Sequence, residues 1–359
     1  MGAAMLLHEA DPRAAVRGEV VELVRIDLVA QMNGDHADDP SRSARVPGKH
    51  RHYAGHVTNS RDMVHIPGGT FLMGSDDFYP DERPAHQREV APFFIDRYEV
   101  TNAQYAEFVE ATGYVTVAER ELDSAAFPGA DPADLVPGAM VFTPTSGPTD
   151  LREWRNWWRW QPGAFWRRPF GPDSSIDDLL QHPVVHIAFE DAVAYADWVG
   201  MRLPTEAEHE YAARGGVDGA PFAWGDEAYP GGVAQANSWL GRFPYDNQGV
   251  GGTAPVGSYP PNGYGLYDMI ANVWEWTTDF YTPRHLRLSD APVDPGKRTN
   301  LLAAASAQEG FPDIPRRVLK GGSHLCSPDY CLRFRPAARS PQAEDTGMSH
   351  IGFRLTRSE

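Results

Sequence analysis

Glycine and proline are unusually frequent in this chain, and they limit the folds that it can adopt. The 359 residues include 34 glycines and 31 prolines, about 18% of the sequence, which is above the usual rate. Glycine is conformationally free and proline lacks a backbone N–H, so both interrupt regular helices and strands. Hydrophobic residues still make up 42% of the chain, enough for a sizeable core. We therefore expect a single α+β domain with little regular secondary structure.

The charge and hydropathy of the chain argue against nucleic-acid and membrane partners. The formal net charge is −17 at pH 7, so phosphate groups would be repelled. No stretch approaches the roughly 18 apolar residues that a membrane span needs. The first ten residues lack the basic and long apolar segments of a secretory signal. We expect a cytoplasmic protein, in which cysteines would be free thiols or metal ligands.

The chain is expected to divide into an N-terminal extension, residues 1–62, and a folded domain, residues 63–359. The extension contains an apolar segment at residues 19–30. A polar stretch with several histidines follows it, and its composition predicts disorder. The folded domain is expected to open with two short strands joined by the turn at residues 67–69. A further strand is predicted at residues 93–98.

Three helices are predicted in the folded domain. A Thr-x-x-Gln box at residues 101–104 and a Thr-x-x-Glu box at residues 205–208 can cap helix N-termini. The first of these helices would end at Gly113 and the second before Gly215, because glycine readily takes the left-handed conformation that closes a helix. The remaining helix is predicted at residues 190–199.

The two cysteines, Cys326 and Cys331, lie five residues apart in the segment GGSHLCSPDYC. A disulfide across this short turn would stabilise the fold by about 2 kcal/mol or less. Structural zinc would need four ligands, and His324 and His350 could complete such a set. Two thiolates also suit Cu(I), a soft ion that accepts two-coordinate geometry and leaves room for a third thiolate. The composition alone does not choose among these three interpretations.

The segments around the cysteines, and others along most of the domain, resemble one known family. They include IPGGTFLMGS (66–75), VTNAQYAEFVEATGY (100–114), RLPTEAEHEYAARGG (202–216), GTAPVGSYPPNGYGLYDMIANVWEW (252–276) and LKGGSHLCSPDYCLRFRPAARS (319–340). Together they resemble the formylglycine-generating enzymes, the sulfatase-modifying factors. The Asn-x-Trp-Glu-Trp pattern marks a wider superfamily, whereas the Cys-x4-Cys pair is the specific part.

The resemblance implies a modified C-type-lectin-like domain and an oxidoreductase that acts on peptidyl cysteine. Such an enzyme converts a cysteine in a Cys-x-Pro-x-Arg segment of an unfolded sulfatase to Cα-formylglycine with O2. Cys326 and Cys331 match the pair that holds Cu(I), which the substrate thiolate joins. Ser323 and Tyr330 match family positions beside the metal, where hydroxyl groups can orient oxygen or water.

The resemblance also implies bound Ca2+, a hard cation that prefers oxygen ligands. Asp268 and Glu275, with the backbone carbonyls of Ala271 and Val273, match one calcium site of the family. Ala271 stands where the family usually has glycine. An alanine can supply the carbonyl unless the position requires a positive φ.

Three further sets of residues are predicted from their positions. A second calcium site would use Asn237 and the carbonyl of Ser238, although the loop that completes this site is shorter here. Trp166 and Arg167, in a stretch rich in tryptophan and arginine, are predicted to bind substrate. His209 stands where the family usually has tryptophan, and we expect it at the surface or partly buried.

Two alternative functions use the same superfamily domain. A non-haem iron sulfoxide synthase would carry an added helical domain with a His-x3-His-x-Glu set, which is not found in this sequence. A non-catalytic lectin-like binding module would not need the cysteine pair. The retained pair therefore favours the copper-dependent oxidase.

Overall fold

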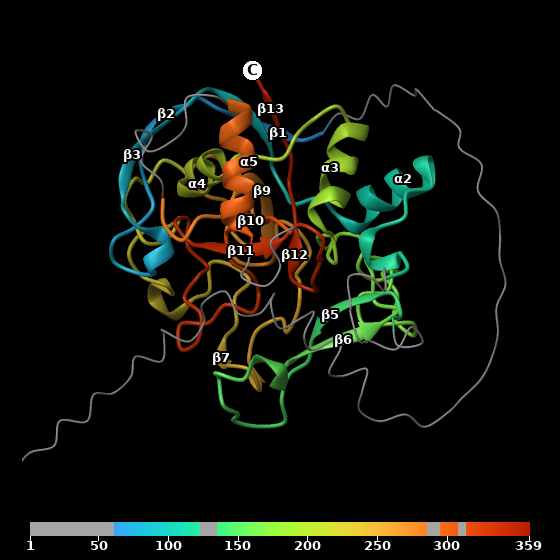
Figure 1. Cartoon of the computed structure of the whole chain (residues 1–359). Coiled ribbons are helices and arrows are strands. Elements are labelled where there is room, and N and C mark those ends of the chain that lie inside the picture. Colours follow the sequence, from blue (N-terminus) through green and yellow to red (C-terminus); the bar gives the residue numbers. More distant parts are fainter. Residues whose placement is uncertain (1–60, 123–134, 286–294, 308–313) are drawn as a thin grey trace, which may run out of the picture.

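The protein is known from a computed structural model, which describes residues 61–122, 135–285, 295–307 and 314–359. In these residues, short strands and a few helices are joined by long irregular loops (Figure 1). The predicted α+β domain with little regular secondary structure is confirmed. Most of the predicted extension lies outside the described residues, including the apolar segment and the histidines. Arg61 and Asp62 belong to the folded part, because Arg61 pairs with Asp96 and the Asp62 carbonyl accepts the Arg97 N–H.

Two sheets form the centre of the fold. The larger sheet has the strand order β11 (Arg339–Ala343), β10 (Arg316–Lys320), β9 (Trp274–Phe280) and β12 (Ile351–Gly352). The smaller sheet has the order β1 (Met63–Ile66), β4 (Phe93–Asp96) and β13 (Thr356–Ser358). All neighbours are antiparallel except β12 and β9, which are parallel. The C-terminal strands thus join segments from the whole length of the domain.

Three two-stranded ribbons accompany these sheets. They are β2 (Gly69–Met73) with β3 (His86–Val90), β5 (Gly138–Phe142) with β6 (Trp158–Pro162), and β7 (Gly241–Arg242) with β8 (Asp246–Asn247). The strands predicted on either side of the turn at residues 67–69 are β1 and β2, and the one predicted at residues 93–98 is β4. Single-turn 3-10 helices occupy η2 (Pro80–Glu82), η3 (Val117–Glu119), η5 (Trp154–Asn156) and η6 (Pro230–Gly232).

The three predicted helices form where their caps indicate. They are α2 (Asn102–Thr112), α3 (Phe189–Trp198) and α4 (Glu206–Arg214). The Thr101 hydroxyl accepts the N–H of Gln104, and the Gln104 side chain accepts the N–H of Thr101. Gly113 ends α2 with a φ of 70°, the left-handed conformation that glycine adopts without strain. A further helix, α5 (Pro295–Ser306), lies against β9 and β10 and was not predicted.

The core is dominated by aromatic side chains. The ring of Tyr105 on α2 contacts the rings of Trp166, Tyr195 and Phe353, at centroid distances from 5.2 to 6.3 Å. Offset and edge-on ring pairs of this kind add to the free energy of simple area burial. The large rings therefore pack irregular loops into one core, without long helices or strands.

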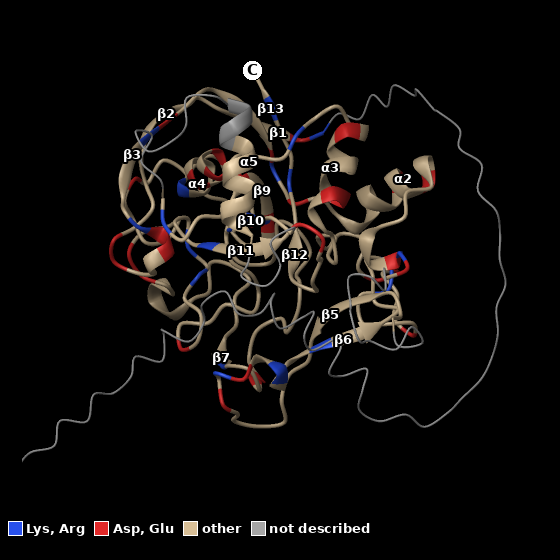
Figure 2. Cartoon of the chain, viewed as in Figure 1, with Lys and Arg blue, Asp and Glu red and all other residues tan. Residues whose placement is uncertain are grey.

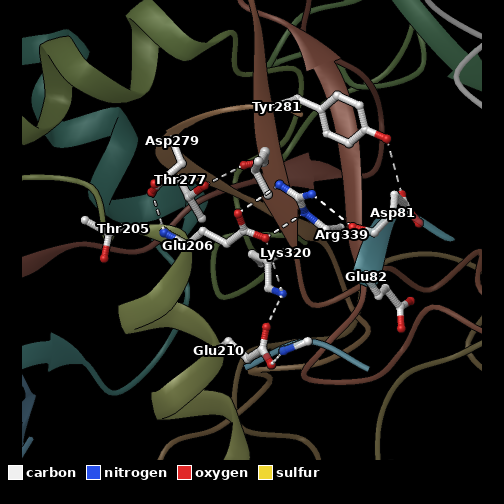
Figure 3. Close-up of polar contacts among 12 residues, drawn as sticks. Asp81, Glu82, Thr205, Glu206, Glu210, Thr277, Asp279, Tyr281, Lys320 and Arg339 are labelled. Carbon is white, nitrogen blue, oxygen red and sulfur yellow. Dashed lines mark hydrogen bonds and ion pairs between the residues drawn. The ribbon is translucent and has the colours of Figure 1, made fainter. Parts of the chain in front are cut away.

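A group of buried ion pairs joins α4 to the central sheet. Lys320 ends β10 and Arg339 begins β11, and the two residues are paired across the strands. The Lys320 ammonium lies 2.9 Å from Glu210, and the Arg339 guanidinium lies 2.7 Å from Glu206. All four side chains are nearly or completely buried. Figure 3 shows Lys320 reaching between the two α4 carboxylates, with Arg339 on the far side of Glu206.

Acidic and basic residues are otherwise intermixed along the described chain (Figure 2). None of the described helices has the length and the apolar character needed to cross a bilayer.

Removing the charge of Glu210 should destabilise the protein. Burial opposes its ionisation, but Lys320 and Arg214 outweigh burial and lower the pKa of Glu210 to about 2. Glu210→Gln would leave these cations without a full counter-charge and should reduce the free energy of unfolding by about 3 kcal/mol at pH 7. A carboxylate with a lowered pKa stabilises the fold above its unfolded pKa, and this contribution is lost as the pH falls toward 2. The difference between variant and wild type should therefore narrow below about pH 4.5.

Denaturant unfolding at pH 7 and at pH 3.5 measures both effects. Glu107→Gln, on the exposed side of α2, is the control and should change the free energy of unfolding by less than about 0.5 kcal/mol. A Glu210→Gln protein as stable as wild type at pH 7 would contradict the assignment of this ion pair.

Candidate active site

The two cysteines lie in the loop between β10 and β11, which buried ion pairs hold at several points. Lys320 and Arg339 close the base of this loop. Within it, Arg335 donates to Glu82 at 2.9 Å, and both side chains are completely buried. Since Glu82 lies in η2, more than 200 residues earlier in the chain, the loop is fixed by tertiary contacts as well as by its own turns.

Arg333 makes a second contact between the loop and η2. Its guanidinium donates to Asp81 at 3.1 Å and lies 4.0 Å from the centre of the Tyr79 ring. The Tyr79 hydroxyl in turn accepts the N–H of Leu332 at 3.0 Å. Arg333 is thus a fixed positive charge two residues after the second cysteine.

A tight turn brings the two thiols together. The carbonyl of Ser327 accepts the N–H groups of Tyr330 and Cys331, and the N–H of Ser327 donates to the Cys331 carbonyl. The Sγ atoms of Cys326 and Cys331 lie 3.7 Å apart, and both residues are free thiols. Metal–sulfur bonds are about 2.3 Å long, so sulfurs at this separation can contact one ion.

The surroundings of the thiols favour a thiolate on Cys326. Burial opposes ionisation, but hydrogen bonds from Cys331 and the Ser323 N–H, together with the charge of Arg333, lower the pKa of Cys326. The hydrogen bond with Cys326 and burial raise the pKa of Cys331 well above its ordinary value. The pair therefore shares one proton, with Cys331 as the donor and Cys326 as the acceptor.

Both thiols line a cavity of about 120 Å³. Its walls are mainly aromatic, with polar groups between the rings: Trp157, Trp158, Phe243, Trp274, Leu319, Ser323, Leu325, Tyr330, Arg333, Ser340, Pro341, Gln342, Met348 and His350 complete the lining. The ring of Tyr330 stacks on Phe243 at 4.3 Å. Burial and the neighbouring thiols raise the pKa of Tyr330, so its hydroxyl remains a hydrogen-bond donor. The predicted residues Ser323 and Tyr330 are thus brought together with the cysteines.

The structure does not bring Trp166 and Arg167 to this cavity. The indole of Trp166 is buried in the aromatic core against Tyr105, and Arg167 lies exposed with its guanidinium 4.4 Å from the Trp166 ring. The predicted stretch was the relevant one, but Trp157 and Trp158 of the same stretch line the cavity instead. Alternation in β6 could have indicated Trp158, whereas no local pattern distinguishes Trp157 from Trp166.

The predicted calcium ligands belong to a buried carboxylate cluster. Asp268 and Glu275 are 8% and 1% exposed, and Glu275 forms a two-point ion pair with Arg354 at 2.7 and 2.8 Å. Glu99, which the sequence analysis missed, accepts from Asn272 at 2.6 Å. Burial and the charges of Asp268 and Glu275 raise the pKa of Glu99 well above its ordinary value, and burial raises that of Asp268 to about 6.

Two further residues of this region differ from expectation. Ala271 has a φ of 68°, so this position does adopt the left-handed conformation that favours the family's glycine. The prediction that His209 lies at the surface or partly buried is wrong. Its side chain is completely buried, and its Nε2 lies 3.2 Å from Glu275, because α4 packs against β9 at this point.

Asn237 and Ser238, predicted for the second calcium site, are both buried on the loop next to this cluster. The Asn237 side-chain amide donates to Gly252 O at 2.9 Å and to Asn272 Oδ1 at 3.0 Å. The Ser238 hydroxyl lies 3.3 Å from the Tyr229 hydroxyl. The Asn237 amide N–H groups are therefore occupied within the protein.

Within the described parts of the chain, no three His, Cys, Asp or Glu side chains converge to hold a metal ion. The set of Cys326, Cys331, His324 and His350 considered for zinc is therefore not assembled there. His324 instead donates its Nδ1–H to the carbonyl of Asn272 at 2.8 Å.

The fold and the thiol cavity together define a lectin-like α+β domain with a buried pair of cysteines. A family model, the sulfatase-modifying factor enzyme 1-like domain, matches residues 51–359. The chain therefore belongs to the sulfatase-modifying factor family.

Individual relatives agree with this assignment. The formylglycine-generating enzyme of Mycobacterium tuberculosis is 58% identical over 296 residues, which cover 82% of this chain and 96% of that protein. The inactive C-alpha-formylglycine-generating enzyme 2 of Mus musculus is 38% identical over 310 residues, 82% of this chain and 85% of that protein. Among solved structures, PvdO from Pseudomonas aeruginosa has a TM-score of 0.54 and 28% identity, covering 83% of this chain and 94% of that one. Since the family includes a protein named as inactive, function has to be argued from the site.

Replacing Arg333 should make the thiol pair less acidic. The guanidinium lowers the pKa values of both cysteines, so Arg333→Met should shift ionisation of the metal-free thiols to higher pH. The absorbance of the thiolate in the ultraviolet, followed against pH, measures the shift. Arg317→Met is the matched control, because Arg317 is a partly buried arginine on β10 that pairs with Glu344. Unchanged thiol ionisation in Arg333→Met would contradict the role of this charge.

Proposed function

We propose that this protein is a copper-dependent oxidase that converts a cysteine in a Cys-x-Pro-x-Arg segment of an unfolded sulfatase to Cα-formylglycine. The observation that carries the proposal is the pair of free thiols, 3.7 Å apart, on the wall of a cavity. Family membership supports the substrate and the product. The retained cysteine pair supports catalysis and not only binding.

The two thiols suit a soft monovalent ion. Cys326 and Cys331 would hold Cu(I), since thiolates are the ligands that Cu(I) prefers. When bound, copper would take up the substrate thiolate and supply the redox chemistry with O2. The shared proton of the pair would be released on metal binding, because metals bind the thiolate form.

The remaining cavity residues would bind and orient the reactants. The rings of Trp157, Trp158 and Phe243 exclude bulk water from the thiols. The Ser323 hydroxyl and the neutral Tyr330 hydroxyl would orient oxygen or water beside the reacting sulfur. Oxidation of the substrate CH2–SH carbon to an aldehyde removes two electrons, with O2 as the acceptor, and water replaces the sulfur, which leaves as sulfide.

We also propose that the carboxylate cluster holds Ca2+. Asp268, Glu275 and the carbonyls of Ala271 and Val273 would supply oxygen ligands. The support is the charge balance. Three buried carboxylates, Glu99 among them, face the single guanidinium of Arg354. A divalent cation would compensate this excess of buried negative charge.

Conversion of a peptide tests the oxidase directly. The Cu(I)-loaded protein should convert a Leu-Cys-Thr-Pro-Ser-Arg peptide in the presence of O2, and mass spectrometry with an aldehyde-reactive hydrazine detects the product. Cys326→Ser and Cys331→Ser should each lower the rate by at least about 100-fold, because one thiolate cannot replace a two-thiolate site. Ser258→Ala, a change of an exposed hydroxyl outside the cavity, should retain the wild-type rate.

Failure of the loaded wild-type protein, with both thiols reduced, would refute the oxidase. A protein that binds the peptide without oxidising it would then be a binding module. Full activity of Cys326→Ser would remove copper coordination by the pair from the proposal.

Calcium binding should be visible as stabilisation. A ligand that binds only the folded state raises the melting temperature with its concentration. Added Ca2+ should therefore raise the melting temperature of chelator-treated protein, and Asp268→Asn should abolish this rise. Mg2+ at the same concentration is the control ion. A melting temperature that does not respond to Ca2+ would contradict the calcium proposal.

A further inference from the structure

His350 lies on the wall of the thiol cavity, and its ring has no hydrogen-bond partner among the described residues. The cavity lining includes this residue together with both cysteines. Its Nδ1 is completely buried without a hydrogen bond, and no described group bonds to Nε2. Buried polar groups in folded proteins are almost always paired, and an unpaired one costs about 1–3 kcal/mol. A group that enters the cavity is the natural partner.

The ring is held in place although its nitrogens are not paired. The Trp274 N–H donates to the His350 carbonyl at 2.8 Å, immediately before β12. The Trp158 ring meets the imidazole edge-on, at a centroid distance of 4.8 Å. His350 is therefore positioned before any ligand arrives, which limits the entropic cost of using it.

Neighbouring histidines do not satisfy the ring. His186 donates its Nε2–H to the Pro169 carbonyl at 2.8 Å, and His324 donates its Nδ1–H to the Asn272 carbonyl at 2.8 Å. Because a carbonyl only accepts, both N–H groups are committed to the backbone. Burial, with a smaller contribution from these two imidazoles, lowers the pKa of His350 well below its ordinary value. A neutral imidazole offers one donor and one acceptor.

We propose that His350 binds the backbone of the substrate peptide next to the reacting cysteine. This inference rests on the proposed function, because it takes a cysteine-containing peptide as the occupant of the cavity. A peptide group offers an N–H and a C=O, the complement of a neutral imidazole. A cavity of about 120 Å³ accepts little more than one small side chain, so the peptide groups flanking the cysteine come to its wall. His350 is then a substrate-binding residue and not a metal ligand.

The test uses a peptide that binds but cannot be oxidised. Fluorescein-labelled Leu-Ser-Thr-Pro-Ser-Arg is titrated with metal-free protein, and anisotropy gives Kd. His350→Phe should weaken binding by about 10-fold, the loss expected for one hydrogen bond. His350→Asn keeps a donor and an acceptor and should stay within about 3-fold of wild type. His182→Phe is the matched control, since His182 is a partly buried histidine bonded to Thr253 outside the cavity.

Turnover by the Cu(I)-loaded variants gives a second readout. His350→Phe should raise KM for the cysteine peptide with kcat nearly unchanged, while Cu(I) affinity in a competition assay stays at the wild-type value. Equal Kd values for wild type and His350→Phe would overturn the inference, as would a fall in kcat at constant KM. If His350→Phe does not fold, His350→Ala answers the same question without added bulk. Wild-type protein that binds the serine peptide but oxidises no cysteine would refute the proposed function alone.

Discussion

The position of the thiol pair depends on the buried ion pairs that close and anchor its loop. Lys320 and Arg339 stand opposite each other at the base of the loop and pair with Glu210 and Glu206 of α4 (Figure 3). Charges buried in this way are costly unless each is paired, so any displacement of the loop would leave unpaired charge in the core. The loop is thereby held in one arrangement, although it contains almost no regular secondary structure.

The same principle operates at the two sites that flank the loop. Arg333 and Arg335 connect it to η2 through Asp81 and Glu82, and Arg354 connects the carboxylate cluster to the end of β12. One of these cations, Arg333, also acts on the chemistry, because its charge favours the thiolates. In a domain rich in glycine and proline, buried ion pairs and aromatic packing supply the rigidity that long helices provide in other folds. A rigid thiol pair beside a preformed cavity is what a soft metal site requires.

Much of the local structure could be predicted from neighbouring residues. Thr101 with Gln104, and Thr205 with Glu208, form the capping boxes that their spacing indicated. The turn that joins Cys326 to Cys331 was expected from five-residue spacing. Trp166 and His209 were placed wrongly, since both are completely buried by contacts with distant segments. Glu99 was missed because its partners Asn272 and Val273 lie more than 170 residues further along the chain.

The sequence by itself determined the helix ends, the first strand pair, the family and the closeness of the two thiols, because each depends on residues that are near in the chain or on a motif. Only the tertiary structure decided which tryptophans line the cavity, which acid meets each buried arginine, and that His350 faces the cavity without a partner. Side chains of one type compete equally for such positions in an extended chain. Their burial and pairing are settled only when the packed elements bring particular ones together.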